Sequence, residues 1–213
     1  MKQLVEELKK LSNSGVVGIK QSFEDEGALQ QDVLTMRRIT EQANLELSIK
    51  IGGCEAKTDI EFCQSIGVNK IVAPMIETPF ALSKFIESVI NVHDIKFYIN
   101  IESTTGAENI KNILNSPSSK LLSGIVVGRS DMAKSYGFSK DQVDGTLISN
   151  TVTNVFETVC DYKLDTLMGG NLSPKSNNII CKLYNKKLLK YIETRNVIIK
   201  LNDSNIKNIP NII

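Results

Sequence analysis

The sequence has a single histidine, His93, and that scarcity limits the chemistry that the chain can perform. His93 lies in a polar stretch, Asn91–Asp94, which is typical of a surface turn. No G-x-S-x-G motif accompanies it, so nothing favours a Ser-His-Asp triad. The sequence also lacks any C-x-x-C pair, although it has four cysteines: Cys54, Cys63, Cys160 and Cys181. A zinc site and a disulfide framework are both poorly supported, and we expect reduced thiols.

Excess charge and long apolar runs are missing too. Lys plus Arg total 25 and Asp plus Glu total 24, so no strong field points to nucleic acid or to an anionic membrane as the partner. No apolar run reaches membrane-spanning length, and the charged, amphipathic stretch Met1–Leu11 has no apolar core of the signal-peptide type. We therefore expect a cytoplasmic protein whose partner is a small molecule or another protein.

What the sequence does contain is a regular alternation of short β-branched runs and longer helical patterns. Seven strands are predicted, at 15–20, 47–51, 70–76, 96–101, 124–127, 165–168 and 196–201. Helical segments are predicted between them, at 28–43, 56–66, 79–92, 107–114, 141–160 and 174–189. This order predicts a parallel sheet in one α/β domain over residues 1–213. We favour a (β/α)8 TIM-type barrel, shortened or with one irregular strand, over a doubly wound open sheet, because polar residues follow nearly every strand.

The carboxyl ends of the predicted strands carry acids, and two of them form the candidate metal site. Glu102 follows the strand at 96–101 and shares a face with Asn100, two positions earlier. Asp131 follows the next strand in the segment Gly128–Asp131. Two inward carboxylates on neighbouring strands repel each other unless a cation lies between them, and oxygen ligands favour Mg²⁺ or Mn²⁺. The alternative for Asp131, and for Glu77 before Pro79, is that each only caps the next helix.

At these residues the sequence resembles a known family. "NIESTTGAENIKNIL" (100–114) and "SGIVVGRSDMAKSYG" (123–137) are similar to the HpcH/HpaI aldolase and citrate lyase beta-subunit family, in which a strand ending in an acid precedes a Gly-x-x-Asp segment. "IVAPMIET" (71–78) and "LSIKIGG" (47–53) resemble the family's preceding strands, and the similarity spans about residues 15–137.

The resemblance implies a metal-dependent carbon–carbon lyase on a (β/α)8 barrel, acting on a small 2-oxo acid or a related acyl substrate. Glu102 and Asp131 would bind Mg²⁺ or Mn²⁺, with Asn100 at a neighbouring polar position. The metal would stabilise the enolate that forms as the carbon–carbon bond breaks. A homo-oligomer is also implied, and a seven-stranded sheet would leave an edge for a neighbour to cover.

The sequence departs from the family at two positions that matter for catalysis. Lys50 replaces the usual arginine, which keeps the charge and loses the bidentate fork. No histidine stands in the segment 20–29 where the aldolases place a base, so Glu26, Glu24 or Lys20 would have to serve; we predict catalytic roles for Glu26 and Lys50.

Several further residues are candidates for binding substrate. Besides Lys50 and Asn100 they are Gly52, Gly53, Glu77 and Arg129, which all follow predicted strands. The alternatives are that the glycine pair only permits a tight bend and that Arg129 forms a subunit contact. The pair Gly169-Gly170 is read as a plain turn rather than an anion site. The segment Glu193–Arg195 precedes the last predicted strand, so we expect it at the far end of the barrel in a structural role.

Two alternatives to the metal-dependent lyase stay open at this point. Lys50 could form a Schiff base with a carbonyl substrate, as metal-free aldolases do. The chain could also be a non-catalytic barrel that binds a metabolite, because a strand and a histidine are missing.

Overall fold

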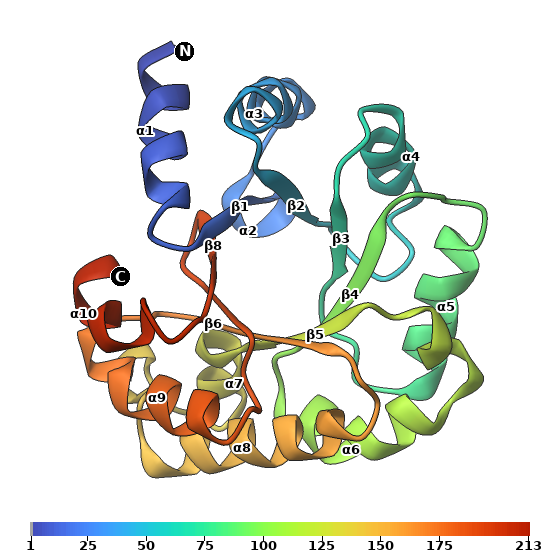
Figure 1. Cartoon of the computed structure of the whole chain (residues 1–213). Helices are drawn as coiled ribbons and strands as arrows, with labels where there is room; N and C mark the ends of the chain where they lie inside the picture. The colour runs from blue at the N-terminus through green and yellow to red at the C-terminus, as the bar shows by residue number, and fades with distance from the viewer. Residues whose placement is uncertain (1) are drawn as a thin grey trace.

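Eight strands close into a barrel in the computed structural model, which describes residues 2–213 (Figure 1). Each strand is hydrogen-bonded to its neighbours in sequence order, and β8 returns to β1. The strands are β1 (Val16–Ser22), β2 (Glu46–Lys50), β3 (Lys70–Ala73), β4 (Lys96–Ile101), β5 (Gly124–Gly128), β6 (Asp165–Gly169), β7 (Tyr191–Glu193) and β8 (Val197–Lys200). The expected α/β barrel is therefore confirmed, and one of its strands is irregular in direction.

Helices surround the strands on the outside of the barrel (Figure 1). The α-helices are α1 (Lys2–Ser12), α2 (Phe23–Glu26), α3 (Gln30–Ala43), α4 (Lys57–Ser65), α5 (Pro79–Val89), α6 (Thr104–Asn115), α7 (Arg129–Ser135), α8 (Thr146–Cys160), α9 (Asn177–Asn185) and α10 (Ile209–Ile212). Short 3₁₀ segments are η1 (Pro117–Leu121), η2 (Lys140–Gln142), η3 (Pro174–Ser176) and η4 (Ile206–Asn208). None of the helices within residues 2–213 combines the length and the apolar character needed to cross a membrane.

Local start and stop signals explain several of these boundaries. The Thr78 hydroxyl accepts a hydrogen bond from the Ala81 backbone amide, and Pro79 occupies the first turn of α5. Gly67, with φ of 65°, follows the end of α4 in the left-handed region that favours glycine. These two predicted boundaries are confirmed, whereas the helix predicted over 174–189 begins as η3 and ends at Asn185.

The last two strands correct the predicted topology. β7 pairs in parallel with β6, but β8 runs antiparallel to both β7 and β1. The predicted strand at 196–201 exists as β8 in the opposite direction, and the missing strand is the three-residue β7. A parallel partner would need a long crossover, whereas Thr194 turns the chain at once by donating its amide hydrogen bond to the Val197 carbonyl at 2.9 Å.

This reversal has two consequences. The turn after Glu193 lies at the carboxyl ends of the parallel strands, so its expected position at the far end of the barrel is wrong. The closed barrel also removes the open sheet edge that was one argument for assembly. Homo-oligomerisation stays a prediction, which light scattering will test.

The barrel interior is apolar in its middle and polar at both ends. Its central cluster consists of Val72, Tyr98, Val126, Leu167 and Ile198. Side chains two residues apart on a strand face the same side, so the positions two residues before and after this layer also point inward. A larger apolar layer between strands and helices surrounds the barrel and supplies most of its core.

Buried polar groups fill the interior at the amino ends of the strands. Lys70 is 2% exposed, and its Nζ lies 2.6 Å from a Glu46 carboxylate oxygen. The same ammonium lies 5.5 Å from the ring centre of Tyr98 and 5.4 Å from that of Tyr191. The Tyr98 hydroxyl donates to Asp165 at 2.8 Å. These groups satisfy one another and hold the barrel together opposite the site.

Thiol reactivity should follow burial. Cys63 is fully buried, and burial, followed by the charge of Asp59, raises the pKa of its thiol to about 12. Cys160 is exposed. We expect a disulfide reagent at pH 8 to label Cys160 within minutes and Cys63 only after unfolding in urea, because the thiolate is the reactive species. Mass mapping checks this, and labelling of native Cys63 as fast as Cys160 would contradict the packing.

Candidate active site

A cavity of about 490 Å³ opens at the carboxyl ends of the parallel strands. Most of the residues that line it are charged or polar, and they come from the ends of β1, β2, β4, β5, β6 and β7 and from the loops that follow. The lining includes Lys20, Asp25, Glu26, Lys50, Asn100, Glu102, Ser130, Asp131, Lys140, Asn171, Glu193 and Arg195. In a barrel this is the end at which reactive side chains gather.

Glu102, directly after β4, is the most constrained carboxylate of the cavity. Its side chain is 2% exposed. Oε2 accepts hydrogen bonds from Asn100 Nδ2 at 2.9 Å and from Lys50 Nζ at 3.2 Å, and Oε1 accepts one from the Met75 backbone amide at 3.1 Å. Met75 has φ of 50°, a left-handed conformation that costs a non-glycine residue about 1–2 kcal/mol. Backbone strain at Met75 thus accompanies the fixed orientation of this carboxylate.

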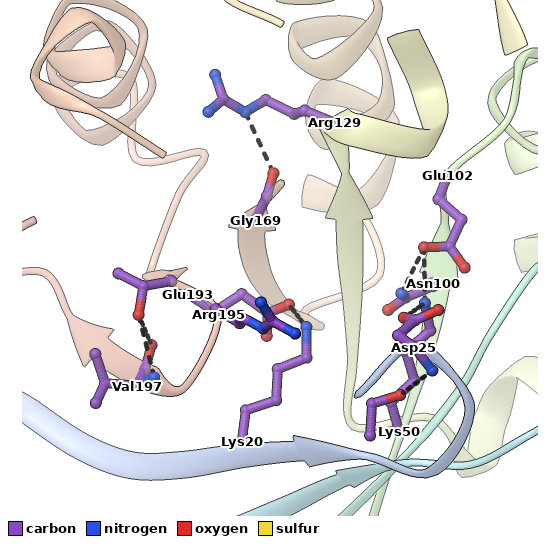
Figure 2. Close-up of polar contacts among 12 residues, drawn as sticks. Lys20, Asp25, Lys50, Asn100, Glu102, Arg129, Gly169, Glu193, Arg195 and Val197 are labelled. Atoms are coloured by element: carbon purple, nitrogen blue, oxygen red, sulfur yellow. Dashed lines mark hydrogen bonds and ion pairs between the residues drawn. The ribbon is translucent and has the colours of Figure 1, made fainter. Parts of the chain in front are cut away.

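Lys50, at the end of β2, joins two acids. Its Nζ lies 2.6 Å from an Asp25 oxygen and 3.2 Å from Glu102 Oε2, and Figure 2 shows the three side chains together with Asn100. Burial alone would lower the pKa of the Lys50 amine, but the charge of Glu102 and the hydrogen bond and charge of Asp25 raise it above its ordinary value. Lys50 is therefore an ammonium at neutral pH.

A second buried ion pair lies across the cavity. Lys20 on β1 directs its amine to Glu193 on β7, with 2.7 Å between Nζ and Oε1 (Figure 2). Burial would lower the pKa of Lys20, and the charge and hydrogen bond of Glu193 outweigh that effect and raise it. Two ammonium groups of the mouth, those of Lys20 and Lys50, are thus each paired with a carboxylate from another part of the barrel.

Asp131 lies in the first turn of α7 and lines the same cavity as Glu102. Its side chain is 30% exposed, and Lys134 Nζ lies 2.7 Å from its Oδ1. Asn100 Oδ1 is buried and has no hydrogen-bond partner among residues 2–213, a state that normally marks a missing water, ion or ligand. Two carboxylates and an unsatisfied amide oxygen are donors of the kind that a hard divalent cation takes.

The protein does not supply a complete coordination shell by itself. Within residues 2–213 no three His, Cys, Asp or Glu side chains stand close enough together to hold a metal ion. Mg²⁺ commonly keeps several waters and takes only one or two carboxylates, so waters and substrate oxygens can complete the shell. The residues present fit such an ion.

Four of the predicted substrate-binding residues lie outside the cavity lining. Gly52 and Gly53 line a neighbouring hollow, where the Gly52 amide donates to Asp59 at 2.8 Å. Glu77 accepts a hydrogen bond from the Ser103 hydroxyl. Gly52, Gly53 and Glu77 therefore contact neighbouring parts of the protein rather than the cavity.

Arg129, the fourth, is turned away from the ion pairs of the mouth (Figure 2). Its side chain is 1% exposed, and it donates to the carbonyls of Gly169 and Gly170, to the Ser176 hydroxyl and to Asp144. Burial lowers the pKa of the guanidinium, an effect that Asp144 opposes. The expectation that Arg129 contacts substrate does not agree with these contacts, because its donors are already occupied by the protein.

Sequence reasoning missed several cavity residues, including Asp25, Lys140 and the segment Glu193–Arg195. Asp25 was within a recognised acidic segment, but nothing in the sequence distinguished it from Glu24 and Glu26. The segment Glu193–Arg195 was assigned to the wrong end of the barrel because the direction of β8 was not foreseen. The short Glu-Thr-Arg turn between two apolar runs was the available signal of a hairpin.

Known proteins are similar to this chain in sequence and in fold. Residues 31–164 match the HpcH/HpaI aldolase/citrate lyase family, and no curated protein matches. The fold is similar to that of an HpcH/HpaI aldolase/citrate lyase family protein from Burkholderia cenocepacia J2315, with TM-score 0.71, 15% identity and coverage of 89% of this chain and 82% of that one.

Two further solved structures share the fold. The citrate synthase SbnG has TM-score 0.72 and 15% identity, over 89% of this chain and 81% of that one. The citrate lyase beta subunit of M. tuberculosis, complexed with oxaloacetate and magnesium, has TM-score 0.62 and 14% identity, over 98% of this chain and 91% of that one. At these identities the likeness shows the fold, while the matched residues, which are well over half of the chain, show that this protein belongs to the HpcH/HpaI aldolase/citrate lyase family.

Proposed function

We propose that the protein is a divalent-metal-dependent carbon–carbon lyase that cleaves a small 4-hydroxy-2-oxo acid. The observation that carries the proposal is that Glu102 and Asp131 line one cavity together with the unsatisfied Oδ1 of Asn100. Membership of an aldolase and citrate lyase family supports the reaction class. The complex of oxaloacetate and magnesium with a similarly folded protein supports the choice of a 2-oxo acid and a hard cation.

Glu102, Asp131 and the Asn100 amide oxygen would hold Mg²⁺ or Mn²⁺. The ion, when bound, supplies a Lewis acid that draws charge from the keto oxygen of the substrate. The chain's own contribution is to fix Glu102 through three hydrogen bonds and to surround the substrate with the ammonium groups of Lys20 and Lys50. These two cations favour an anionic substrate and the negative charge that develops as the carbon–carbon bond breaks.

A Schiff base on Lys50 is a weaker alternative on the same geometry. The amine would have to be neutral to attack a carbonyl, yet carboxylates at 2.6 and 3.2 Å keep it protonated. A non-catalytic metabolite-binding barrel is the remaining alternative, and it differs from the lyase in the absence of turnover.

Metal removal separates these alternatives. We expect EDTA to abolish cleavage of 4-hydroxy-2-oxo acids and Mn²⁺ or Mg²⁺ to restore it. A coupled dehydrogenase assay measures the 2-oxo acid that cleavage releases. Borohydride added with substrate should leave the protein mass unchanged. Cleavage that survives EDTA, together with a borohydride-trapped adduct on Lys50, would establish the Schiff-base mechanism, and saturable metabolite binding without turnover would establish the binding protein.

A further inference from the structure

Two glycines at the ends of neighbouring strands leave room for two carboxylates that line the cavity. Gly128 at the end of β5 and Gly169 at the end of β6 are paired in the sheet register. A Cβ on Gly128 would lie 2.8 Å from Glu102 Oε2, and a Cβ on Gly169 would lie 2.8 Å from Glu193 Cγ and 2.9 Å from its Oε1. Neither position has a left-handed φ, so backbone conformation does not require glycine there. What requires it is space for the two carboxylates.

Each of the two carboxylates is paired with a lysine from another strand. Glu102 follows β4 on one side of this glycine pair and is bound by Lys50, while Glu193 lies on β7 on the other side and is bound by Lys20. Glu193 is 4% exposed, so a buried acid is held there by a single ammonium. A buried ion pair of this kind is weak evidence for stability alone, because its desolvation cost offsets much of its attraction. Its position in the cavity wall indicates a use in the reaction.

We propose that Glu193 is the general base of carbon–carbon cleavage, an inference that rests on the proposed function. Cleavage of a 4-hydroxy-2-oxo acid requires removal of the proton on the C4 hydroxyl, and no histidine lines the cavity among residues 2–213. The Glu193 carboxylate takes this proton, the O–H electrons form the aldehyde, and the C3–C4 bond electrons pass into the enolate. The resulting carboxylic acid then returns the proton to C3, which gives the 2-oxo acid and regenerates Glu193.

Lys20 acts as a positioning residue for this base. At 2.7 Å its ammonium fixes Oε1 of Glu193, a residue that lines the cavity. The Lys20 ammonium contacts only this one of the two carboxylate oxygens. Glu26, the base suggested by the sequence, also lines the cavity, but its ion-pair partner is the Nε of the mostly exposed Arg195 at 3.5 Å, so it lacks a comparable fixed orientation. Glu193 lies at the mouth because it ends β7, which runs parallel to β6.

The test compares Glu193→Gln with Glu26→Gln and with Glu157→Gln, whose surface carboxylate pairs with Lys186 at 3.0 Å. We expect kcat for cleavage to fall about 10²–10⁴-fold in Glu193→Gln, the usual range for loss of a general base, and to change little in Glu157→Gln. KM and the calorimetric affinities for Mn²⁺ and pyruvate should change less than about threefold, since the variant retains the groups that hold them. A larger loss in Glu26→Gln than in Glu193→Gln would overturn the assignment.

Decarboxylation of oxaloacetate provides a second readout. This reaction forms the same enolate by loss of CO₂, with no hydroxyl proton to remove. The ratio of decarboxylation to cleavage should therefore rise at least about tenfold in Glu193→Gln. An equal fall of both rates would show a merely structural role for Glu193. A wild-type protein that performs neither reaction with metal would instead refute the proposed function, so the two failures are distinguishable.

Two further variants keep the test decisive if Glu193→Gln folds poorly. Gly169→Ala keeps the Glu193 carboxylate but adds a methyl group that would lie 2.8 Å from its Cγ, so the side chain must shift. We therefore expect a similar selective loss of cleavage. Lys20→Met should lower kcat for cleavage, and Lys20→Arg should recover part of it because the cation is kept. Full cleavage in Gly169→Ala and Lys20→Met would contradict the proposal.

Discussion

Replacing Glu102 by glutamine should lower the rate of carbon–carbon cleavage by about 10²–10³-fold or more, because it removes a charge at the centre of the site. The change should also destabilise the fold. Three donors, on Met75, Asn100 and Lys50, point at this carboxylate, and a glutamine offers one acceptor oxygen in place of two. A donor left facing the new amide group costs about 1–3 kcal/mol, which urea unfolding will measure.

Glu77→Gln is the matched control for this variant. Glu77 is the acid after the preceding strand and binds the Ser103 hydroxyl outside the cavity lining. Its replacement should leave cleavage within about twofold of the wild type, as is usual for a substitution away from reacting groups. If Glu77→Gln removed activity as fully as Glu102→Gln, the assignment of Glu102 rather than Glu77 to the active site would be contradicted.

Replacing Arg129 by lysine should destabilise the protein by about 3 kcal/mol, at the lower end of the loss that follows disruption of a buried charged pair. One guanidinium donates to Gly169 O at 3.2 Å, Gly170 O at 3.0 Å, Ser176 Oγ at 3.1 Å and Asp144 Oδ1 at 2.7 Å. A lysine keeps the charge but cannot reach all four acceptors. Thermal unfolding should show a Tm lower by about 6–12 °C for a chain of this size.

Arg195→Lys serves as the comparison, since the Arg195 side chain is 76% exposed. Its effect on stability should be within about 0.5 kcal/mol, as for most surface substitutions. Equal stability of Arg129→Lys and the wild type would contradict the structural role of Arg129. A strong rise in KM with unchanged stability would restore the earlier expectation that Arg129 binds substrate.

The sequence allowed the barrel and the position of its acids to be predicted because both depend on local patterns. β-branched runs of four to seven residues indicated the strands, and the two-residue spacing of Asn100 and Glu102 placed both side chains on one face. Parallel strands bring their carboxyl ends to one edge, so Glu102 and Asp131 could be expected together before any coordinates were known.

The features that escaped prediction depend on long-range geometry. The three residues of β7 are too few to show the two-residue alternation of a strand. The antiparallel direction of β8 is decided by closure of the barrel against β1. The same limit applies to Arg129, whose four partners lie 15 to 47 residues further along the chain. Its position directly after a strand looked like that of a substrate ligand, and only the packed loops show that its donors are occupied.

A crystal of the protein soaked in Mn²⁺, measured by anomalous scattering, tests the central claim most directly. The account predicts one strong manganese peak at the barrel mouth, coordinated by carboxylate oxygens of both Glu102 and Asp131. Manganese bound by only one of these acids, or located away from the mouth, would contradict it.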